Sequence, residues 1–166
     1  MKLDAIDVRI LARLQQEGRI AKTQLAEHAN LSPSACFRRV ERLMELGYIR
    51  GYRAQIEYSR ILSIDLVIVE ITLESHHFED FERFENAIRE VPEVTECIAV
   101  GGGLDYIVKF AVTSIAHYQE LFEELLKARI GIDKYYSYIA TRLVKSQAEP
   151  PVEHLLARAR RDAERN

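Results

Sequence analysis

The sequence has few of the residues that form covalent cross-links. Its 166 residues include two cysteines, four prolines, seven glycines and no tryptophan. Cys36 and Cys97 lie far apart, and neither belongs to a Cys-x-x-Cys motif. We therefore expect both thiols to be reduced and buried as small hydrophobic side chains, which predicts a cytoplasmic protein.

Long apolar runs are also missing, although 48% of the residues are hydrophobic. No run approaches the ~20 apolar residues that a membrane-spanning helix requires. Charged residues occupy the N-terminal positions that would be apolar in a signal peptide. The composition predicts a globular protein with a buried core and no membrane association.

Motifs for catalysis and metal binding are absent as well. The histidines form no HExxH motif, and the adjacent pair His76-His77 is a poor chelate. There is no Gly-x-Ser-x-Gly motif, and the glycines at 101–103 are not followed by the Lys-Ser/Thr of a phosphate-binding loop. We predict that the protein is not an enzyme and that it holds no metal or cofactor.

The charge of the chain is unevenly distributed. Residues 1–60 carry 11 Lys and Arg against 7 Asp and Glu, whereas residues 61–145 carry 8 against 15. The net charge of the whole chain is −3. A basic N-terminal part joined to an acidic remainder predicts that only the N-terminal part contacts a polyanion.

The basic part contains the pattern of a helix-turn-helix between residues 18 and 51. Apolar residues recur at helical spacing on both sides of a turn at 30–31. Ser32 is a favourable N-cap, Pro33 suits the first position of the second helix, and Gly47 suits its end. The inward-facing positions of this second helix are Cys36, Val40 and Leu43.

The outward positions of the second helix predict a DNA-recognition surface. The N-terminal residues of recognition helices lie nearest to the base edges, so we predict base contacts from Ser34, Ala35 and Arg38. Arg39 and Arg42 are predicted to contact phosphates. Two alternatives stay open: the arginines are merely solvated on a helical hairpin, or Arg39 is an ion-pair partner inside the domain.

The flanking segments complete a winged helix-turn-helix domain over residues 1–56. Residues 4–17 predict a preceding helix with one apolar face. Residues 48–56 have the pattern of two short strands around Gly51, which would form the wing. Arg50 and Arg53 lie where a wing contacts phosphate, and Arg53 is the predicted DNA contact.

A repeated β-α-β pattern fills residues 64–145, after a linker at 57–63. The predicted strands are 66–73, 94–100, 106–112 and 132–144, and the predicted helices are centred on 78–88 and 118–126. Two such units, offset by roughly 40 residues, indicate a ferredoxin-like βαββαβ fold with two helices on one face of a sheet. The whole chain is therefore predicted to be an α+β protein.

The strands of this second domain predict self-association. Residues 66–69 are apolar without interruption, so both faces of the sheet need cover, and two helices cover only one. A second subunit is the simplest cover, which predicts a dimer. The remaining tail, residues 146–166, is predicted to be helical or partly disordered; the alternative is a second basic contact or a partner-binding helix.

Short motifs occur in a fixed order between residues 3 and 145. In the N-terminal part they are Leu3-Asp4, Ile6-Asp7, Ile10-Leu11, Gly18-Arg19-Ile20, Leu25-Ala26, Leu31-Ser32-Pro33, Arg39-Val40, Leu43 and Gly47-Tyr48-Ile49. In the C-terminal part they are Glu96-Cys97, Val100, Gly102, Asp105-Tyr106 and Val144-Lys145. Together these motifs resemble the Lrp/AsnC family of leucine-responsive and asparagine-operon regulators.

The resemblance implies a transcriptional regulator that binds double-stranded DNA as a dimer, commonly assembled into an octamer. It also implies a small amino-acid effector, bound between dimers by Gly102, Gly103 and Asp105, with Ser137 as a further candidate. The family loop commonly reads Gly-Asp-x-Asp-Tyr, and here Gly103 replaces the first acid. Backbone N–H groups would then bind the effector carboxylate and Asp105 its ammonium group. The alternative function is an architectural DNA-binding protein that senses no ligand.

Overall fold

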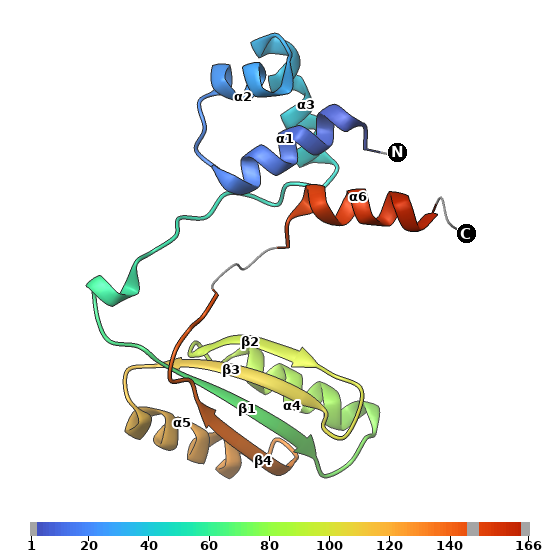
Figure 1. Cartoon of the computed structure of the whole chain (residues 1–166). Coiled ribbons are helices and arrows are strands. Elements are labelled where there is room, and N and C mark those ends of the chain that lie inside the picture. The colour runs from blue at the N-terminus through green and yellow to red at the C-terminus, as the bar shows by residue number, and fades with distance from the viewer. Residues whose placement is uncertain (1–2, 146–149, 164–166) are drawn as a thin grey trace. The chain divides into compact units, whose positions relative to one another are not determined.

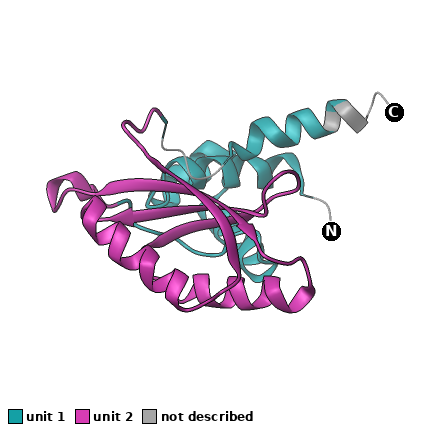
Figure 2. Cartoon of the chain, turned by 90° about the horizontal axis from the view of Figure 1, so that it is seen from below, with its two compact units in different colours: residues 1–55, 145–166 teal, residues 56–144 magenta. Residues whose placement is uncertain are grey.

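The computed structural model describes residues 3–145 and 150–163. The chain divides into two compact units, residues 1–55 with 145–166 and residues 56–144 (Figure 2). Within the described ranges, no helix combines the length and apolar character needed to cross a membrane.

The first unit is built on three helices, α1 (Ala5–Gln16), α2 (Lys22–Ala29) and α3 (Pro33–Glu45). Their shared core is formed by Ile10, Leu25, Ala26, Ala29, Cys36 and Leu43. Val40 is half-buried and packs against this core, so the predicted inward face of α3 is confirmed. Gly47 has φ +75°, which is the left-handed conformation that glycine adopts after a helix end.

The tail contributes a fourth helix to this unit, α6 (Val152–Ala163), which packs against α1 (Figure 1). The Gln15 side chain joins the two. Its Nε2 donates to the carbonyl of Pro150 at 2.8 Å, and its Oε1 accepts from the backbone N–H of Val152 at 3.1 Å. The tail was predicted to be helical or partly disordered; residues 152–163 form a helix, while 146–149 and 164–166 lie outside the described residues.

The two strands predicted at residues 48–56 are not formed, and this prediction was wrong. The N–H groups of Tyr48 and Ile49 instead bond to the carbonyl of Leu43 at 2.9 and 3.2 Å, which closes the end of α3. The following residues have no regular structure until a short 3-10 turn at Tyr58–Arg60. Two strands of a few residues each form too few cross-strand pairs to be stable as an isolated hairpin.

The second unit is a four-stranded antiparallel sheet with two helices on one face (Figure 1). Its elements are β1 (Asp65–Leu73), α4 (Phe78–Arg89), β2 (Val94–Ala99), β3 (Tyr106–Val112), α5 (Ile115–Lys127) and β4 (Ile132–Ile139). The strand order β2-β3-β1-β4 confirms the ferredoxin-like fold. β4 ends at Ile139 rather than at 144, because Ile139 pairs with Val67 near the start of its partner β1.

The two faces of the sheet differ in burial. Side chains directed toward the helices, including Val69, Val108 and Phe110, are fully buried. The opposite face, here called the open face, consists of Leu66, Ile68, Glu70, Glu96, Ile98, Ile107, Lys109, Ala111, Tyr136 and Tyr138. It is apolar in most positions but also carries an ion pair between Lys109 and Glu96.

The two cysteines also differ. Cys36 is buried as predicted, but Cys97 is exposed, contrary to the prediction. Cys97 lies on β2, which is an edge strand of the sheet and is bonded on one side only. Sequence spacing could not show this, because it depends on the order in which the strands pair.

Candidate DNA and effector sites

The N-terminal end of α3 is fixed by Ser32. Its Oγ accepts the backbone N–H of Ala35 at 3.3 Å and lies 3.3 Å from the hydroxyl of Ser34. Ser34 and Arg38 follow on the exposed side of α3, one helical turn apart. Within the described part of the chain, the Arg38 guanidinium makes no hydrogen bond or ion pair. Its donors therefore remain available to a ligand.

Sequence reasoning missed an aromatic residue on the same side of α3. Phe37 is 40% exposed, and the Lys22 Nζ on α2 lies 4.2 Å from its ring centroid. A ring held at this position suits an apolar contact with a thymine methyl group. The signal was present in the sequence, because Phe37 does not share the spacing of the inward residues Cys36, Val40 and Leu43. We define the recognition face as Ser34, Phe37, Arg38 and Glu41.

Arg39 and Arg42 are directed toward α1 instead, where they surround Asp7. The Asp7 carboxylate is 1% exposed and accepts from Arg39 at 2.8 Å and from Arg42 at 2.6 Å. Arg39 also pairs with Asp4 at 2.6 Å. The alternative in which Arg39 is an ion-pair partner inside the domain is confirmed, and Arg42 shares this role.

The same acids cap α1. Asp4 accepts the backbone N–H groups of Ile6 and Asp7, and Asp7 accepts the N–H of Asp4 in return. The N–H of Asp7 and the Arg39 guanidinium together hold the pKa of Asp4 below its ordinary value. Sequence reasoning missed this role of Asp7, although the spacing of Asp4 and Asp7 is that of a reciprocal cap.

The predicted wing arginines lie on the irregular segment that follows α3. Arg50 and Arg53 are exposed, and neither has a hydrogen bond or ion pair to another described residue. Their charges are available to phosphate, but no strand holds them in place. The backbone of Arg38 is therefore held within α3, whereas Arg53 lies on a segment without regular structure.

The predicted effector loop joins β2 and β3. Gly102 has φ +146°, and a Cβ on Gly102 or Gly103 would meet no atom within 4 Å. Asp105 lies at the start of β3, with its side chain 14% exposed. One carboxylate oxygen accepts the N–H of Leu73 at 2.8 Å, and the other lies 3.1 Å from Nε2 of His76. Asp105 thus has a structural role at the end of β1, and His76 is a neighbour that sequence reasoning missed.

Within one chain, Ser137 does not lie next to the loop between β2 and β3. It lies on β4, which is separated from β3 by β1, and it pairs with Val69 in the middle of the sheet. Its hydroxyl bonds to the phenol of Tyr118 on α5 at 2.5 Å. Across the described residues, no three His, Cys, Asp or Glu side chains come together as a metal site.

Comparison with known families accounts for both units. Residues 3–50 match the family described as winged helix-turn-helix DNA-binding, and residues 66–150 match the Lrp/AsnC ligand binding domain. The chain belongs to the Lrp/AsnC family. As a member, it is a DNA-binding transcriptional regulator with a ligand-binding domain, which confirms the resemblance seen in the sequence.

Bacterial regulatory proteins match along most of the chain. The transcriptional regulatory protein DoeX of Halomonas elongata is 48% identical over 145 residues, covering 87% of this chain and 92% of DoeX. The leucine-responsive regulatory protein of Escherichia coli K12 is 37% identical, covering 86% and 87%. Both relatives are regulatory proteins by name, in agreement with the prediction that the protein is not an enzyme.

Solved structures of two transcriptional regulators share the fold. The regulator NMB0573 of Neisseria meningitidis, solved in complex with L-Met, has a TM-score of 0.85 at 27% identity and covers 93% of this chain and 99% of its own. An AsnC family regulator of Agrobacterium tumefaciens has a TM-score of 0.85 at 31% identity, with coverage of 92% and 99%.

Proposed function

We propose that this regulator reads operator DNA with the recognition face of α3 and that a small amino acid controls it. The proposal of DNA binding rests on which of the three arginines of α3 form ion pairs. Arg39 and Arg42 are paired with Asp7, whereas Arg38 is exposed without a partner among the described residues, one turn after the capped helix end. Arg38 is therefore the side chain of α3 that reaches base edges.

Ser34 and Ala35 lie at the start of α3, where recognition helices approach bases. Arg53 is proposed to contact phosphate from the segment after α3. Arg39 and Arg42 remain predicted phosphate contacts, since a guanidinium has five N–H donors and Asp7 uses only some of them. Their first role is nevertheless to hold α3 against α1. We propose a cytoplasmic location, because a regulator that binds operator DNA must reach the chromosome.

The open face of the sheet supports a dimer. It gathers Ile68, Ile98 and Ile107 with Tyr136 and Tyr138, and Tyr136 is 63% exposed in the single chain. A contiguous apolar surface of this kind is uncommon on soluble monomers and is typical of an interface. A two-fold dimer places two α3 helices on half-sites about one DNA turn, or a multiple, apart. Assembly of dimers into an octamer is proposed from the family alone.

A small amino acid is the proposed effector, because the Neisseria regulator was solved with L-Met and this chain matches the Lrp/AsnC ligand binding domain. In the effector loop, Gly102 and Gly103 offer backbone N–H groups, and Asp105 offers the carboxylate for an ammonium group. A ligand that binds one assembly state more tightly increases the population of that state, and this changes how much of the DNA is occupied. An architectural protein that senses no ligand is the alternative.

Replacing Arg38 with alanine tests the DNA part. We expect Arg38→Ala to weaken binding to the operator by about 1–3 kcal/mol and to relax the base preference at one position. Loss of Arg53 should instead weaken all sequences alike and reduce the salt slope by about one. Gel-shift titrations against operator and scrambled DNA measure both, with Arg89→Ala on α4 as a control. Undiminished operator affinity in Arg38→Ala would remove this residue from the interface.

Replacing Asp105 with asparagine tests the effector loop. The amide oxygen can still accept the N–H of Leu73, so the strand end is kept while the charge is lost. We expect the amino acid to bind at least about tenfold more weakly, since hydrogen bonds to charged groups contribute about 1.5–3 kcal/mol. DNA binding without effector should be unchanged. Calorimetry across the common amino acids measures this, and unchanged affinity would mean that Asp105 does not hold the ligand.

A further inference from the structure

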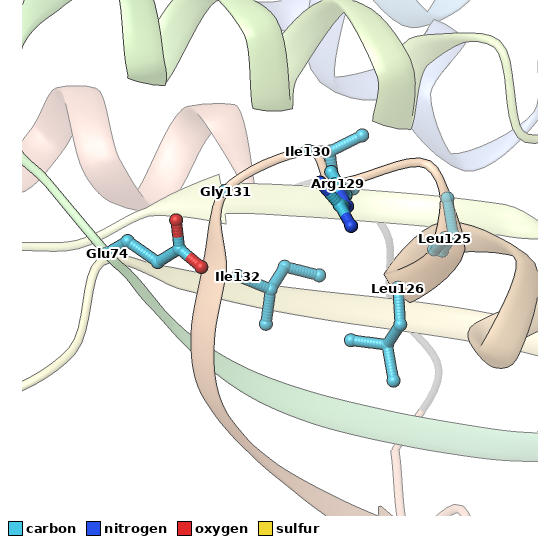
Figure 3. A pocket seen from close by; sticks show the side chains of 7 residues that line it. All are labelled: Glu74, Leu125, Leu126, Arg129, Ile130, Gly131 and Ile132. Atoms are coloured by element: carbon cyan, nitrogen blue, oxygen red, sulfur yellow. The ribbon is translucent and has the colours of Figure 1, made fainter.

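The two units present different surfaces to ligands. In the second unit, a hollow lies where α5 ends and β4 begins, with Glu74 and Arg129 in its lining (Figure 3). This hollow falls within the residues that match the Lrp/AsnC ligand binding domain, so the family already accounts for ligand binding there. The first unit instead carries an exposed aromatic side chain, Phe37 on α3, whose position the packing of the unit does not explain.

Phe37 takes no part in the core of the first unit. Its side chain is 40% exposed, and it is not among the described residues that form or flank that core. The preceding residue, Cys36, points into the core and is 2% exposed. Single exposed hydrophobic residues are common on proteins and need no function. Phe37 differs from such residues in two respects, which are its contact with Lys22 and its place beside Arg38.

Lys22 restricts the ring of Phe37. The Lys22 Nζ lies 4.2 Å from the ring centroid, in a cation–π contact between the first residue of α2 and the first half of α3. Among the described residues, no carboxylate pairs with Lys22. Its ammonium group is therefore available to a phosphate at the edge of the groove while it holds the ring. A ring that is held before binding loses less conformational entropy when it contacts a base.

Phe37 and Arg38 are neighbours on the recognition face. Ser34 precedes them by three and four residues and Glu41 follows them by four and three, so the four side chains share one side of the helix. In the major groove, arginine bonds to O6 and N7 of guanine, and an apolar side chain contacts the C5-methyl group of thymine. A phenyl ring has no hydrogen-bonding group, so the methyl group is the feature of a base edge that it can recognise. Two neighbouring side chains of these kinds predict contacts with two neighbouring base pairs.

We propose that Phe37 reads the C5-methyl group of a pyrimidine next to the guanine that Arg38 contacts. The inference rests on the proposed DNA binding by α3 and adds the chemical group that Phe37 recognises. Thymine and 5-methylcytosine both carry this methyl group at the same place in the major groove. Phe37 therefore makes the regulator sensitive to thymine at this base pair and to C5-methylation of a cytosine that replaces it.

Uracil substitution tests the proposal, because uracil is thymine without the methyl group. Selection with the full-length protein on random duplexes gives a preferred sequence, in which each thymine is then replaced with uracil. We expect one replacement in each half-site to weaken binding in gel shifts about fourfold. This is the burial of one methyl-sized group, about 0.8 kcal/mol, converted at about 1.4 kcal/mol per tenfold. Phe37→Ala should bind both duplexes equally, whereas Phe37→Leu keeps an apolar side chain and should still prefer thymine.

Phe78→Ala is the matched control for Phe37→Ala. Phe78 is also an exposed phenylalanine, but it lies at the start of α4 in the second unit, so this variant should keep both the affinity and the preference for the methyl group. Cytosine and 5-methylcytosine at the sensitive position separate the methyl group from the rest of the base. The wild type should bind the methylated duplex about fourfold more tightly than the unmethylated one. Phe37→Ala should not distinguish them.

The absence of any uracil-sensitive thymine in the wild type would overturn the proposal, and so would uracil effects that all persist in Phe37→Ala. A change in the sedimentation of free Phe37→Ala, with its DNA preference unchanged, would overturn it as well, because Phe37 would then be a contact between copies of the chain. Arg38→Ala distinguishes this failure from that of DNA binding by α3. If Arg38→Ala weakens operator binding but no thymine is sensitive, only the role of Phe37 fails. If Arg38→Ala binds undiminished, the recognition face fails and the role of Phe37 fails with it.

Discussion

Asp7→Ala is expected to destabilise the DNA-binding unit by about 3 kcal/mol, the lower end of the range for breaking a buried ion pair. The carboxylate is 1% exposed and pairs with Arg39 and Arg42, which are 28% and 37% exposed. The substitution leaves Arg42 without its anion and Arg39 with Asp4 alone, and Nε of Arg42 is already buried without a hydrogen bond. Partial exposure of the arginines is the reason for choosing the lower end. Urea unfolding measures the loss directly.

Glu17→Ala is the matched control for Asp7→Ala. Glu17 forms an ion pair with Arg13 on the same helix, but its side chain is 49% exposed. Exposed pairs of this spacing contribute about 0.3–0.5 kcal/mol, so the control should remain close to the wild type. A loss below about 0.5 kcal/mol in Asp7→Ala would contradict the structural role of the cluster. A second measurement is the DNA affinity of Asp7→Ala by gel shift, corrected for the folded fraction. This affinity rises if Arg39 and Arg42, released from Asp7, reach phosphate.

Ile98→Glu is expected to break the dimer. Ile98 is 45% exposed in the single chain and pairs with Ile107 on the open face. In a dimer formed through this face, two new carboxylates are placed in an apolar interface and near Glu70 and Glu96. Like charges brought together at an interface cost several kcal/mol, which raises the dimer Kd about a hundredfold or more. Sedimentation velocity at micromolar concentration should then show a monomer that binds a two-half-site operator weakly.

Phe78→Glu is the control for this substitution. Phe78 is 71% exposed at the start of α4, away from the open face, so the same change from apolar to acidic should leave the dimer intact. The melting curve of each variant shows that the fold survives, because neither side chain is buried in the single chain. A stable dimer in Ile98→Glu would mean that subunits associate through a different surface.

The secondary structure was largely predictable because each element carries a local signal. Ser32 and Pro33 mark the start of α3 by hydrogen bonding and backbone geometry that do not depend on distant residues. In β1, Val67, Val69 and Ile71 are buried at alternate positions. The sequence could not show which face of the strand the helices cover, because residues 66–69 are all apolar. The two strands predicted at 48–56 are not formed for the complementary reason, since strands need partners and the residues around Gly51 have none within the described chain.

The roles of the functional residues could be predicted only where they do not depend on contacts with residues distant in the sequence. The sequence separates Arg38 from Arg39 and Arg42 only by position along the helix, and it predicted that all three contact DNA. Asp7 distinguishes them, and it lies more than thirty residues away. Asp105 was found from the family loop, but its bond to Leu73 and its contact with His76 depend on the pairing of β1 with β3.

The sequence by itself determined where α3 begins, the βαββαβ order and the family, because capping, periodicity and motif order are local properties of the chain. Only the tertiary structure decided which arginine of α3 is free and that α6 packs on α1 through Gln15. These facts depend on contacts between residues distant in the chain. Long-range contacts follow from packing and strand order, which no local pattern specifies.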